Sequence, residues 1–555
     1  MTAINASPAQ PEPHAAEQGS SVKVPARPWA FWSLFGVLLG ISALLLFTQL
    51  GHYALWDDET YSAFGAEGIL ATGDTSAVVG HNVVAFHNGL MLKNLCDRLT
   101  PPLPAYVIAV SFRLFGVSAF AARLPFALCG LASIAFIGYW LRKKQATFLR
   151  VLLMTIAITG NASLFLYFRQ ARYYGMAIFC SLVLAYFYCE WKGSWRQITL
   201  AALASIGLFG SHYLAYVAVY GALLVDYLAW GRRSIKVRLP DVVWLFVFQA
   251  LVCVPLALIW NPFGTQHGER LFSNTLLQRL TLIWWNVRDL NRCEFGVGLL
   301  LLAAPVFYAW RRDVWWIRGV VAISVYIAVI SLLSPQTVSI TSVADVRYIV
   351  PLIPLCLLVG VLSLEKLTAR FPLIAVSLAV VAFHTNILHL GPLVDGDVRF
   401  TSASFAGELA YPPGEPYSLA GQWIRENVRP GQSIWVQPGY MTYPLMFQAP
   451  QALYAWQLEM PPQPQFSALP AIHFQGLVPP DYMIAFGPVV QPLVAQLTHW
   501  DRAKYKLDTV LNVYWKDMYR PELFWRSFVP VRGFNPNTEA VYIFKRIGMA
   551  PLKTP

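Results

Sequence analysis

The sequence predicts a polytopic α-helical membrane protein with about 11 transmembrane helices and a small periplasmic α/β C-terminal domain. Of its 555 residues, 56% are hydrophobic and 13% are charged, which is too apolar for soluble domains of ordinary composition. Apolar runs long enough to span a bilayer recur up to residue 391, and the composition then turns polar and Pro-rich. The net charge of +12 does not indicate nucleic-acid binding, because the basic residues are scattered in twos and threes.

Eleven apolar runs define the expected spans. Residues 1–27 are polar and without periodicity, which predicts a disordered cytoplasmic tail. Pro28 to Leu50 follows without a small-residue cleavage site and is expected to be an uncleaved anchor. The other ten runs lie near 120–141, 147–168, 172–190, 197–212, 213–230, 241–260, 296–310, 315–334, 348–364 and 371–391.

The distribution of Lys and Arg predicts the orientation of these spans. Basic residues occur at every second boundary, which marks those loops as cytoplasmic. They are Lys23/Arg27, Arg142–Lys144, Lys192/Arg196, Arg232/Arg233/Lys236/Arg238, Arg311/Arg312/Arg318 and Lys366/Arg370. The N-terminus is then cytoplasmic, and the first loop (51–119) and residues 392–555 are periplasmic.

The short apolar segment from Pro101 to Phe115 does not fit as a span. It opens with Pro-Pro and contains Arg113, and counting it would place the later basic clusters on the wrong side. We expect it to be a helix lying in the outer interface.

The region after His389 is expected to form the α/β domain. Ser418 resembles an N-cap for a helix that ends at Pro430-Gly431. Three β-like runs follow at 433–436, 482–486 and 540–544.

Three consecutive acids, Asp57, Asp58 and Glu59, lie immediately outside the first span. Closely packed like charges raise one another's pKa, so the triplet is either costly or solvated. A solvated loop beside a helix is the simple interpretation. The surrounding motifs favour a functional role instead.

These motifs together resemble the GT-C glycosyltransferases. The resemblance rests on Trp-x-Asp-Glu (56–59), Pro-Pro-Leu (101–103), Leu-Phe-Gly-Val-Ser (114–118), Arg-Leu-Pro (123–125), Phe-Arg-Gln-Ala-Arg-Tyr (168–173) and Arg-Tyr-Ile-Val-Pro (347–351). The pattern is most similar to the bacterial branch that includes protein O-mannosyltransferases, lipid A aminoarabinose transferases and rhizobial lipopolysaccharide-core galacturonosyltransferases. It covers residues 28–391. It implies an enzyme of the bacterial inner membrane that uses an undecaprenyl-phosphate-linked sugar.

The resemblance also implies roles for residues of the first loop and the outer ends of spans. Asp58 and Glu59, with Asp57 beside them, match the family's catalytic base, which removes the proton of an acceptor hydroxyl in an inverting displacement. Donor phosphate is expected to bind Arg347, Tyr348, Arg172, Arg98 and Arg123, since arginine meets phosphate oxygens in a bidentate way. The alternative for Arg172 and Arg347 is snorkelling to lipid headgroups. Arg123 could equally anchor lipid or support the loop.

Two positions depart from the pattern of relatives. Thr100 stands where related transferases often carry a basic residue before Pro-Pro, and Arg98 is the candidate replacement. Residues 169–174 stand where aminoarabinose transferases place an acid, which favours the galacturonosyl-like or mannosyl-like branch.

Other polar groups complete the candidate site. His212, Tyr213 and Tyr173 are expected to line a substrate cavity, because polar pairs at membrane depth usually do so. No H-E-x-x-H spacing occurs, and a divalent cation at Asp58, Glu59 or Asp289 stays open beside simple solvation. Cys96 and Cys293 lie in external loops, and the sequence leaves open whether they pair.

Two rival classes are a transporter or flippase for lipid-linked sugars and an O-antigen polymerase or ligase. Transporters usually carry buried charge on broken midplane helices. Here acids and arginines gather at the outer ends of spans, which favours a transferase. The sequence leaves the sugar open. It also leaves open whether the acceptor is a lipid, a glycan or a protein, and whether its acceptor group is a hydroxyl or a phosphate.

Overall fold

The computed structural model describes the chain from residue 27 to residue 549 with several gaps. The described ranges are 27–89, 92–98, 100–235, 237–260, 274–293, 295–311, 314–336, 338, 346–368, 370–389, 398–412, 414–460, 463–490, 492–493, 503–513 and 540–549. The predicted tail, apart from Arg27, lies outside them.

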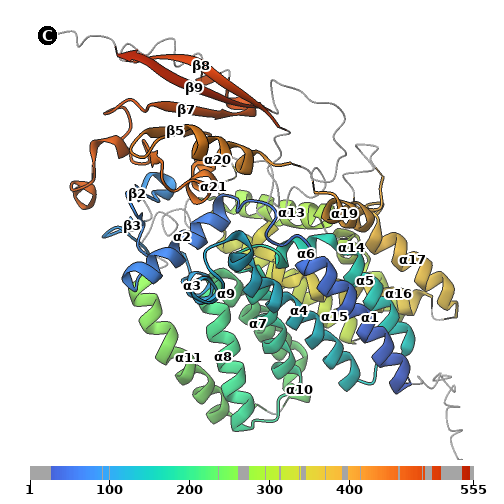
Figure 1. Ribbon diagram of the computed structural model, residues 1–555. Helices are drawn as coiled ribbons and strands as arrows, with labels where there is room; N and C mark the ends of the chain where they lie inside the picture. The colour runs from blue at the N-terminus through green and yellow to red at the C-terminus, as the bar shows by residue number, and fades with distance from the viewer. Residues whose placement is uncertain are drawn as a thin grey trace, which may run out of the picture.

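A helix stands at each of the eleven expected runs, and these helices form one bundle (Figure 1). They are α1 (Pro28–Phe47), α4 (Ala119–Lys143), α5 (Phe148–Gly160) with α6 (Ala162–Phe168), α7 (Tyr174–Cys189), α8 (Trp195–Ser211), α9 (Tyr213–Asp226) with η2 (Tyr227–Gly231), α11 (Leu239–Trp260), α14 (Val297–Arg311), α15 (Val314–Leu333), η3 (Val346–Leu352) with α16 (Ile353–Leu367), and α17 (Pro372–His384). A short α10 (Arg232–Ser234) follows η2.

Within the described residues, six of these helices are long and apolar enough to cross a membrane, or seven if α5 and α6, bent by 64°, form one span. Helices α7 and α17 are apolar but shorter. The helical membrane fold is therefore confirmed. The count of eleven spans stays a prediction for the shorter helices.

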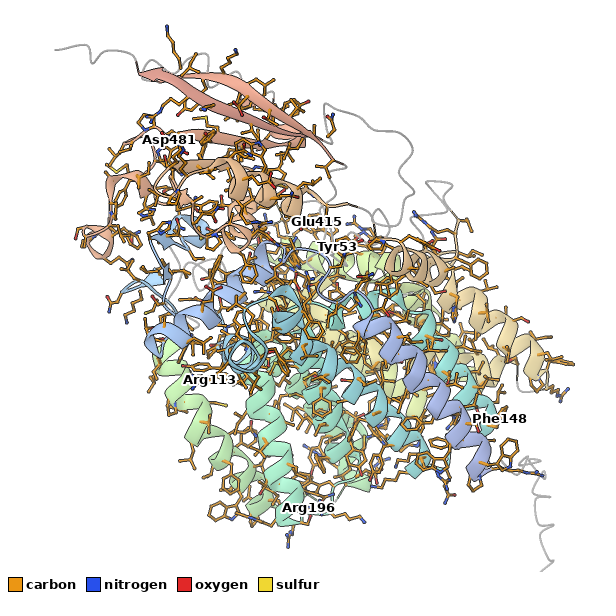
Figure 2. All side chains as sticks on the ribbon, viewed as in Figure 1. Tyr53, Arg113, Phe148, Arg196, Glu415 and Asp481 are labelled. Atoms are coloured by element: carbon orange, nitrogen blue, oxygen red, sulfur yellow. The ribbon has the colours of Figure 1, made fainter. Side chains whose placement is uncertain are left out.

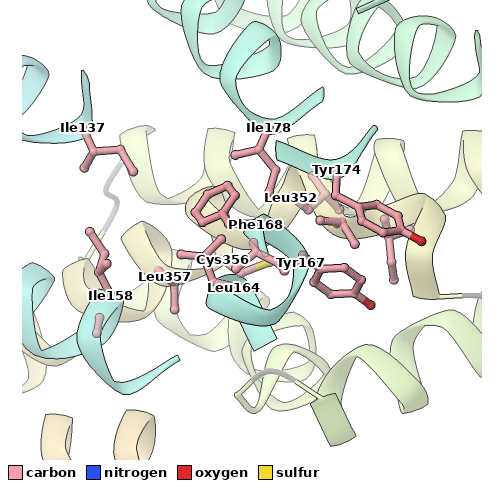
Figure 3. Packing of buried hydrophobic residues seen from close by; sticks show 14 of the residues in the cluster. Ile137, Ile158, Leu164, Tyr167, Phe168, Tyr174, Ile178, Leu352, Cys356 and Leu357 are labelled. Carbon is pink, nitrogen blue, oxygen red and sulfur yellow. The ribbon is translucent and has the colours of Figure 1, made fainter. Parts of the chain in front are cut away.

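The bundle core is built of closely packed aromatic and aliphatic side chains (Figure 3). Phe168, Tyr167 and Tyr174, at the turn between α6 and α7, are almost fully buried. Gly130 on α4 lets Phe168 approach, and a Cβ at Gly175 on α7 would lie 2.6 Å from the Phe126 carbonyl oxygen. Small residues let membrane helices approach closely. This packing fixes the turn 169–173 against α4.

Three helices do not follow the main bundle: α2 (Asp57–Thr72), α3 (Leu103–Phe115) and α13 (Leu276–Cys293). Helix α3 is seen nearly end-on in Figure 1 while α8 runs along the page, so α3 lies across the bundle. Its Arg113 is exposed (Figure 2). This geometry matches the helix expected in the interface. The first loop also holds two small hairpins, β1 (Val78–Val79) with β2 (Asn82–Val83) and β3 (Leu92–Lys93) with β4 (Cys96–Asp97), and η1 (Phe86–Gly89).

The C-terminal region contains a five-stranded mixed sheet with strand order β6-β5-β7-β9-β8. Strand β5 pairs in parallel with β6 and β7, whereas β9 is antiparallel to β7 and β8. Its elements are α19 (Thr401–Ala410), α20 (Pro416–Asn427), β5 (Ser433–Gln437), η4 (Gly439–Met441), α21 (Thr442–Gln448), β6 (Leu453–Tyr454), η5 (Pro464–Phe466), η6 (Ala471–His473), β7 (Tyr482–Phe486), η7 (Gly487–Val489), β8 (Ala503–Asn512) and β9 (Ala540–Met549). The expected α/β domain is confirmed, and the three predicted strands are β5, β7 and β9.

The predicted N-cap of α20 was wrong by three residues. Glu415 caps the helix, because its side chain accepts the Tyr417 N–H at 2.8 Å and the Ser418 N–H at 2.9 Å. Pro416 starts the helix, as its fixed φ favours the first position. Ser418 therefore lies inside the first turn.

Candidate active site

The acid triplet forms the first turn of α2, directly after Trp56. Carboxylates are stabilised at a helix N-terminus by its free N–H groups. Asp57 and Asp58 are 9% and 8% exposed, and Glu59 is fully buried. The triplet is therefore not the solvated loop of the simple interpretation.

Glu59 forms a buried ion pair with Arg123 of α4. Arg123 Nε donates to Glu59 Oε1 at 2.8 Å, and Arg123 Nη2 donates to Oε2 at 2.6 Å. Glu59 also accepts the backbone N–H of Ala171 at 2.7 Å and that of Trp56 at 3.3 Å. One carboxylate thus joins α2, α4 and the turn between α6 and α7.

Arg123 uses its remaining hydrogen bonds on the chain between α1 and α2. Nη1 donates to the carbonyl oxygens of Leu50 and Tyr53 at 3.1 and 2.8 Å, and Nη2 donates to that of Ala54 at 2.9 Å. We call Glu59 and Arg123 the loop anchor. For Arg123 this geometry favours loop support over phosphate binding, and Glu59 has its oxygens committed to protein donors.

Asp58 meets a different pair of cations. Arg347 Nη1, from η3, donates to Asp58 Oδ2, and Arg172 Nη2 lies 3.5 Å from the same oxygen. Arg172 Nη1 also donates to the Asp58 carbonyl and to Ser62 Oγ, each at 3.1 Å. The three side chains of this arginine–acid cluster, Asp58, Arg172 and Arg347, are 12%, 13% and 19% exposed. They are thus more accessible than the loop anchor.

The Nε–H of Arg172 is buried and has no hydrogen-bond partner among the described residues. A buried guanidinium N–H without an acceptor is costly. A phosphate oxygen is the kind of acceptor that this fork binds in bidentate fashion.

Aromatic rings line one side of the arginine–acid cluster. The Tyr173 hydroxyl donates to the Arg347 carbonyl at 3.4 Å. The His212 ring lies 4.3 Å from that of Tyr173 and 5.3 Å from that of Tyr348. His212 caps α9, because its Nδ1 accepts the Ala215 N–H at 2.9 Å. Four of the predicted site residues thus meet here.

Tyr213 and Arg98 are engaged elsewhere. The Tyr213 ring packs against Phe209 at 4.9 Å. Arg98 donates to both carboxylate oxygens of Asp74, at 2.7 and 2.5 Å, and lies over the Trp260 ring. The hydrogen bond from Arg98 lowers the pKa of Asp74 to about 2. Arg98 therefore joins the first loop to the C-terminal end of α11.

Solved structures with a similar arrangement of helices identify the fold. The crystal structure of ArnT from Cupriavidus metallidurans bound to undecaprenyl phosphate matches with a TM-score of 0.54 and 14% identity, over 92% of this chain and 98% of that one. This chain has the GT-C fold. The apo form of the same ArnT matches with a TM-score of 0.50 and 14% identity, over 84% and 96% of the two chains.

Sequence comparisons add a narrower match. Residues 100–260 match the family model described as dolichyl-phosphate-mannose-protein mannosyltransferase. That segment contains α3, Arg123, the turn 169–173 and His212. A search of curated proteins gives no match. The resemblance predicted from the motifs is thus confirmed at the level of the GT-C fold.

The remaining candidates are Asp289, a possible metal site and the two cysteines. Asp289 on α13 pairs with both Nε and Nη2 of Arg288, at 2.6 and 2.8 Å. In the described part of the chain, no group of three or more His, Cys, Asp or Glu could hold a metal ion. Cys96 is a free thiol, and the Cys293 side chain lies outside the described residues.

Sequence reasoning gave no role to two polar residues near the site, Ser62 and Arg169. Ser62 follows Asp58 by four residues, so it lies on the same helical face and can bind Arg172. Arg169 donates to the Leu45, Leu46 and Thr48 carbonyl oxygens at the end of α1. Helical spacing could have found Ser62, whereas nothing in the sequence pointed to the carbonyls.

Proposed function

We propose that this chain transfers a sugar from a polyprenyl-phosphate donor to an acceptor hydroxyl at the outer face of a bacterial inner membrane, with inversion. The observation that carries the proposal is the pairing of Asp58 with Arg347 and Arg172 at the N-terminus of α2. The GT-C fold, the mannosyltransferase family model and an ArnT solved with undecaprenyl phosphate support it.

In this mechanism Asp58 is the general base. It takes the proton of the acceptor hydroxyl as that oxygen forms its bond to the anomeric carbon. The bond from the anomeric carbon to the phosphate oxygen breaks at the same time, and its electron pair leaves with the polyprenyl phosphate. Arg347 and Arg172 stabilise the charge of this leaving group. Tyr348, Tyr173 and His212 wall the site beside them.

Donor binding would also free the base. Without donor, Asp58 Oδ2 accepts a hydrogen bond from Arg347 and lies beside Arg172. A donor phosphate competes for the same guanidinium groups. Their turn toward phosphate releases the Asp58 carboxylate to meet the acceptor hydroxyl when the substrate is in place.

Sugar transfer by the purified full-length protein in nanodiscs tests the proposal. A panel of undecaprenyl-phosphate sugars is offered with lipid A and peptide acceptors, to wild type and to Asp58→Asn. We expect transfer from one donor, reduced about 100- to 10,000-fold in the variant, as for removal of a general base.

Asp481→Asn is the matched control, because Asp481 pairs with Arg546 in the sheet domain, away from α2. It should transfer as wild type does. Undiminished activity in Asp58→Asn would refute the base assignment. Movement of donor across liposomes without transfer would favour the flippase instead.

A further inference from the structure

A small polar cavity lies beside the arginine–acid cluster, between α2, the start of α3 and the hairpins of the first loop. Its free space of about 20 Å³ is enough for a water molecule. Helices α2 and α3 lie side by side here (Figure 1). The polar residues that line this first-loop cavity are Tyr61, Ser62, Thr75, Asp97 and Thr100.

The first-loop cavity lies on the same face of α2 as Asp58. Tyr61, Ser62 and Gly65 all line it, and they follow Asp58 by three, four and seven residues. The cavity therefore begins one helical turn, about 5.4 Å, from the candidate base. Ser62 connects the two places, because its Oγ accepts from Arg172 Nη1 at 3.1 Å. A phosphate bound by Arg172 would thus have the cavity as its neighbour.

Hydrogen bonds within the first loop fix the walls of the cavity. Asp97 Oδ1 accepts the Thr100 N–H at 3.2 Å, and the Asp97 carbonyl accepts from Thr75 Oγ1 at 2.7 Å. Arg98 donates to Thr75 Oγ1 at 3.0 Å and binds both carboxylate oxygens of Asp74. The guanidinium next to Asp97 in the chain is therefore committed to another carboxylate. The polar groups of the cavity are in place before any ligand binds, which lowers the cost of binding.

The lining of the cavity suits the hydroxyl groups of a sugar. A carboxylate accepts hydrogen bonds from hydroxyls, and the hydroxyls of Ser, Thr and Tyr both donate and accept. The Asp97 carboxylate would repel an anionic group in the same place. None of the described lining residues is a Lys or Arg that could bind such a group.

We propose that the first-loop cavity is a subsite for the donor sugar: it binds hydroxyl groups remote from the anomeric carbon, and Asp97 selects an uncharged sugar over a uronic acid. This inference rests on the proposed function. It favours the mannosyl-like over the galacturonosyl-like alternative that the sequence left open.

Donor pairs that differ only at C6 test this selection. The wild-type protein in nanodiscs is offered undecaprenyl-phosphate glucose, galactose and mannose, and the uronic acid of each configuration, with the acceptors named above. We expect kcat/KM for the accepted hexose to exceed that for its uronic acid at least about 100-fold, because two carboxylates would otherwise meet. A preference for the uronic acid would overturn the subsite and leave the transferase assignment intact.

Asp97→Asn isolates the charge of this side chain. Asparagine Oδ1 can still accept the Thr100 N–H, so the loop should keep its fold. We expect kcat/KM for the hexose to fall about tenfold, as for loss of a hydrogen bond to a charged group, and the preference over the uronic acid to shrink. Asp481→Asn, in the sheet domain, is the matched control. Wild-type kcat/KM and wild-type preference in Asp97→Asn would also overturn the subsite.

Binding without acceptor separates the subsite from the proposed function. Isothermal titration of wild type and Asp97→Asn in nanodiscs compares undecaprenyl phosphate with its hexose and uronic acid derivatives. We expect wild type to bind the hexose derivative most tightly, and Asp97→Asn to lose this advantage while its affinity for undecaprenyl phosphate stays the same, because the arginines are untouched. If this pattern appeared without any sugar transfer, the transferase assignment would fail and the subsite would stand. Equal affinities for the three lipids in wild type would overturn the subsite even in an active transferase.

Discussion

Asp58 and Glu59 are neighbours in the chain, yet their carboxylates have opposite surroundings. Glu59 is fully buried and bound by Arg123 and two backbone N–H groups. Asp58 is partly accessible, and its Oδ2 faces two arginines from separate segments. A step of one residue turns a helix by about 100°, so adjacent acids can face different partners. The loop anchor thus holds the loop, and the arginine–acid cluster is the more accessible of the two groups.

This difference shows how a costly acid triplet is tolerated. Each acid has its own stabilising group: Arg123 for Glu59, Arg347 with Arg172 for Asp58, and the Asp58 N–H for Asp57. Burying a charge is tolerated only when it is paired and hydrogen-bonded. The anchor satisfies this condition permanently, whereas a donor phosphate would compete for the partners of Asp58.

Removing Arg123 should have the largest effect. Arg123→Ala leaves the Glu59 carboxylate buried without its cation, and such a change typically costs about 3–5 kcal/mol of stability. Thermal unfolding in nanodiscs measures it. The control is Arg238→Ala, because Arg238 is 69% exposed in its pair with Asp241 and exposed pairs contribute about 0–1 kcal/mol. Equal shifts in the two variants would contradict the role of the loop anchor as a stabilising buried ion pair.

Glu67, two turns further along α2, tests burial without the help of an arginine. Burial raises the pKa of its carboxyl from 4.5 to about 7. A raised pKa means that ionisation destabilises the fold, so stability is lost as the pH rises from about 4.5 through about 7. The free energy of unfolding of Glu67→Gln should therefore exceed that of wild type increasingly over this pH range, by up to about 3 kcal/mol above pH 7. Unfolding measured from pH 4 to 8 checks this, and a gap independent of pH would contradict it.

The sequence predicted the parts of this site that motifs carry, but not the division between them. Asp58, Arg172, Arg347, Tyr348, Tyr173 and His212 were all named from short motifs, and they meet at one place in the structure. The role of Arg123 stayed open because three of its partners are backbone carbonyls. Every residue has a carbonyl, so no residue pattern points to such a partner. The hydrogen bond from the Ala54 N–H to Glu415 joins positions 361 residues apart, which periodicity cannot find.

The fold was likewise predicted only where a residue pattern marks it. Long apolar runs and basic clusters predicted the helices correctly, because these patterns follow from the bilayer itself. Strand β8 was missed because its Lys504 and Lys506 interrupt the apolar pattern at the edge of the sheet, and lysines are common on edge strands. The N-cap of α20 was misplaced because Glu is an uncommon cap.

Arg347→Lys tests whether the fork shape of arginine matters in the cluster. Lysine keeps the charge but binds as a point charge rather than in bidentate fashion. We expect the KM for the polyprenyl-phosphate donor to rise about 10- to 100-fold, roughly 1.4–2.8 kcal/mol, with folding unchanged. Steady-state kinetics over donor concentration measure it. Arg150→Lys, at the pair with Glu365, is the control, and an equal KM in the two variants would argue against phosphate binding by Arg347.

Of the four substitutions, Asp74→Asn should have the smallest effect in free energy, a slight loss of stability. The Arg98–Asp74 pair has good bidentate geometry, but the Asp74 side chain is 39% exposed, so water and salt screen it to about 1 kcal/mol or less. Because Arg98 lowers the pKa of Asp74 from 3.8 to about 2, this stability is complete above about pH 3.8 and is lost as the pH falls through about 2. Unfolding at low and high salt checks the magnitude. If Asp74→Asn cost as much as Arg123→Ala at every salt concentration, bidentate geometry rather than burial would set the strength of the ion pairs of the first loop.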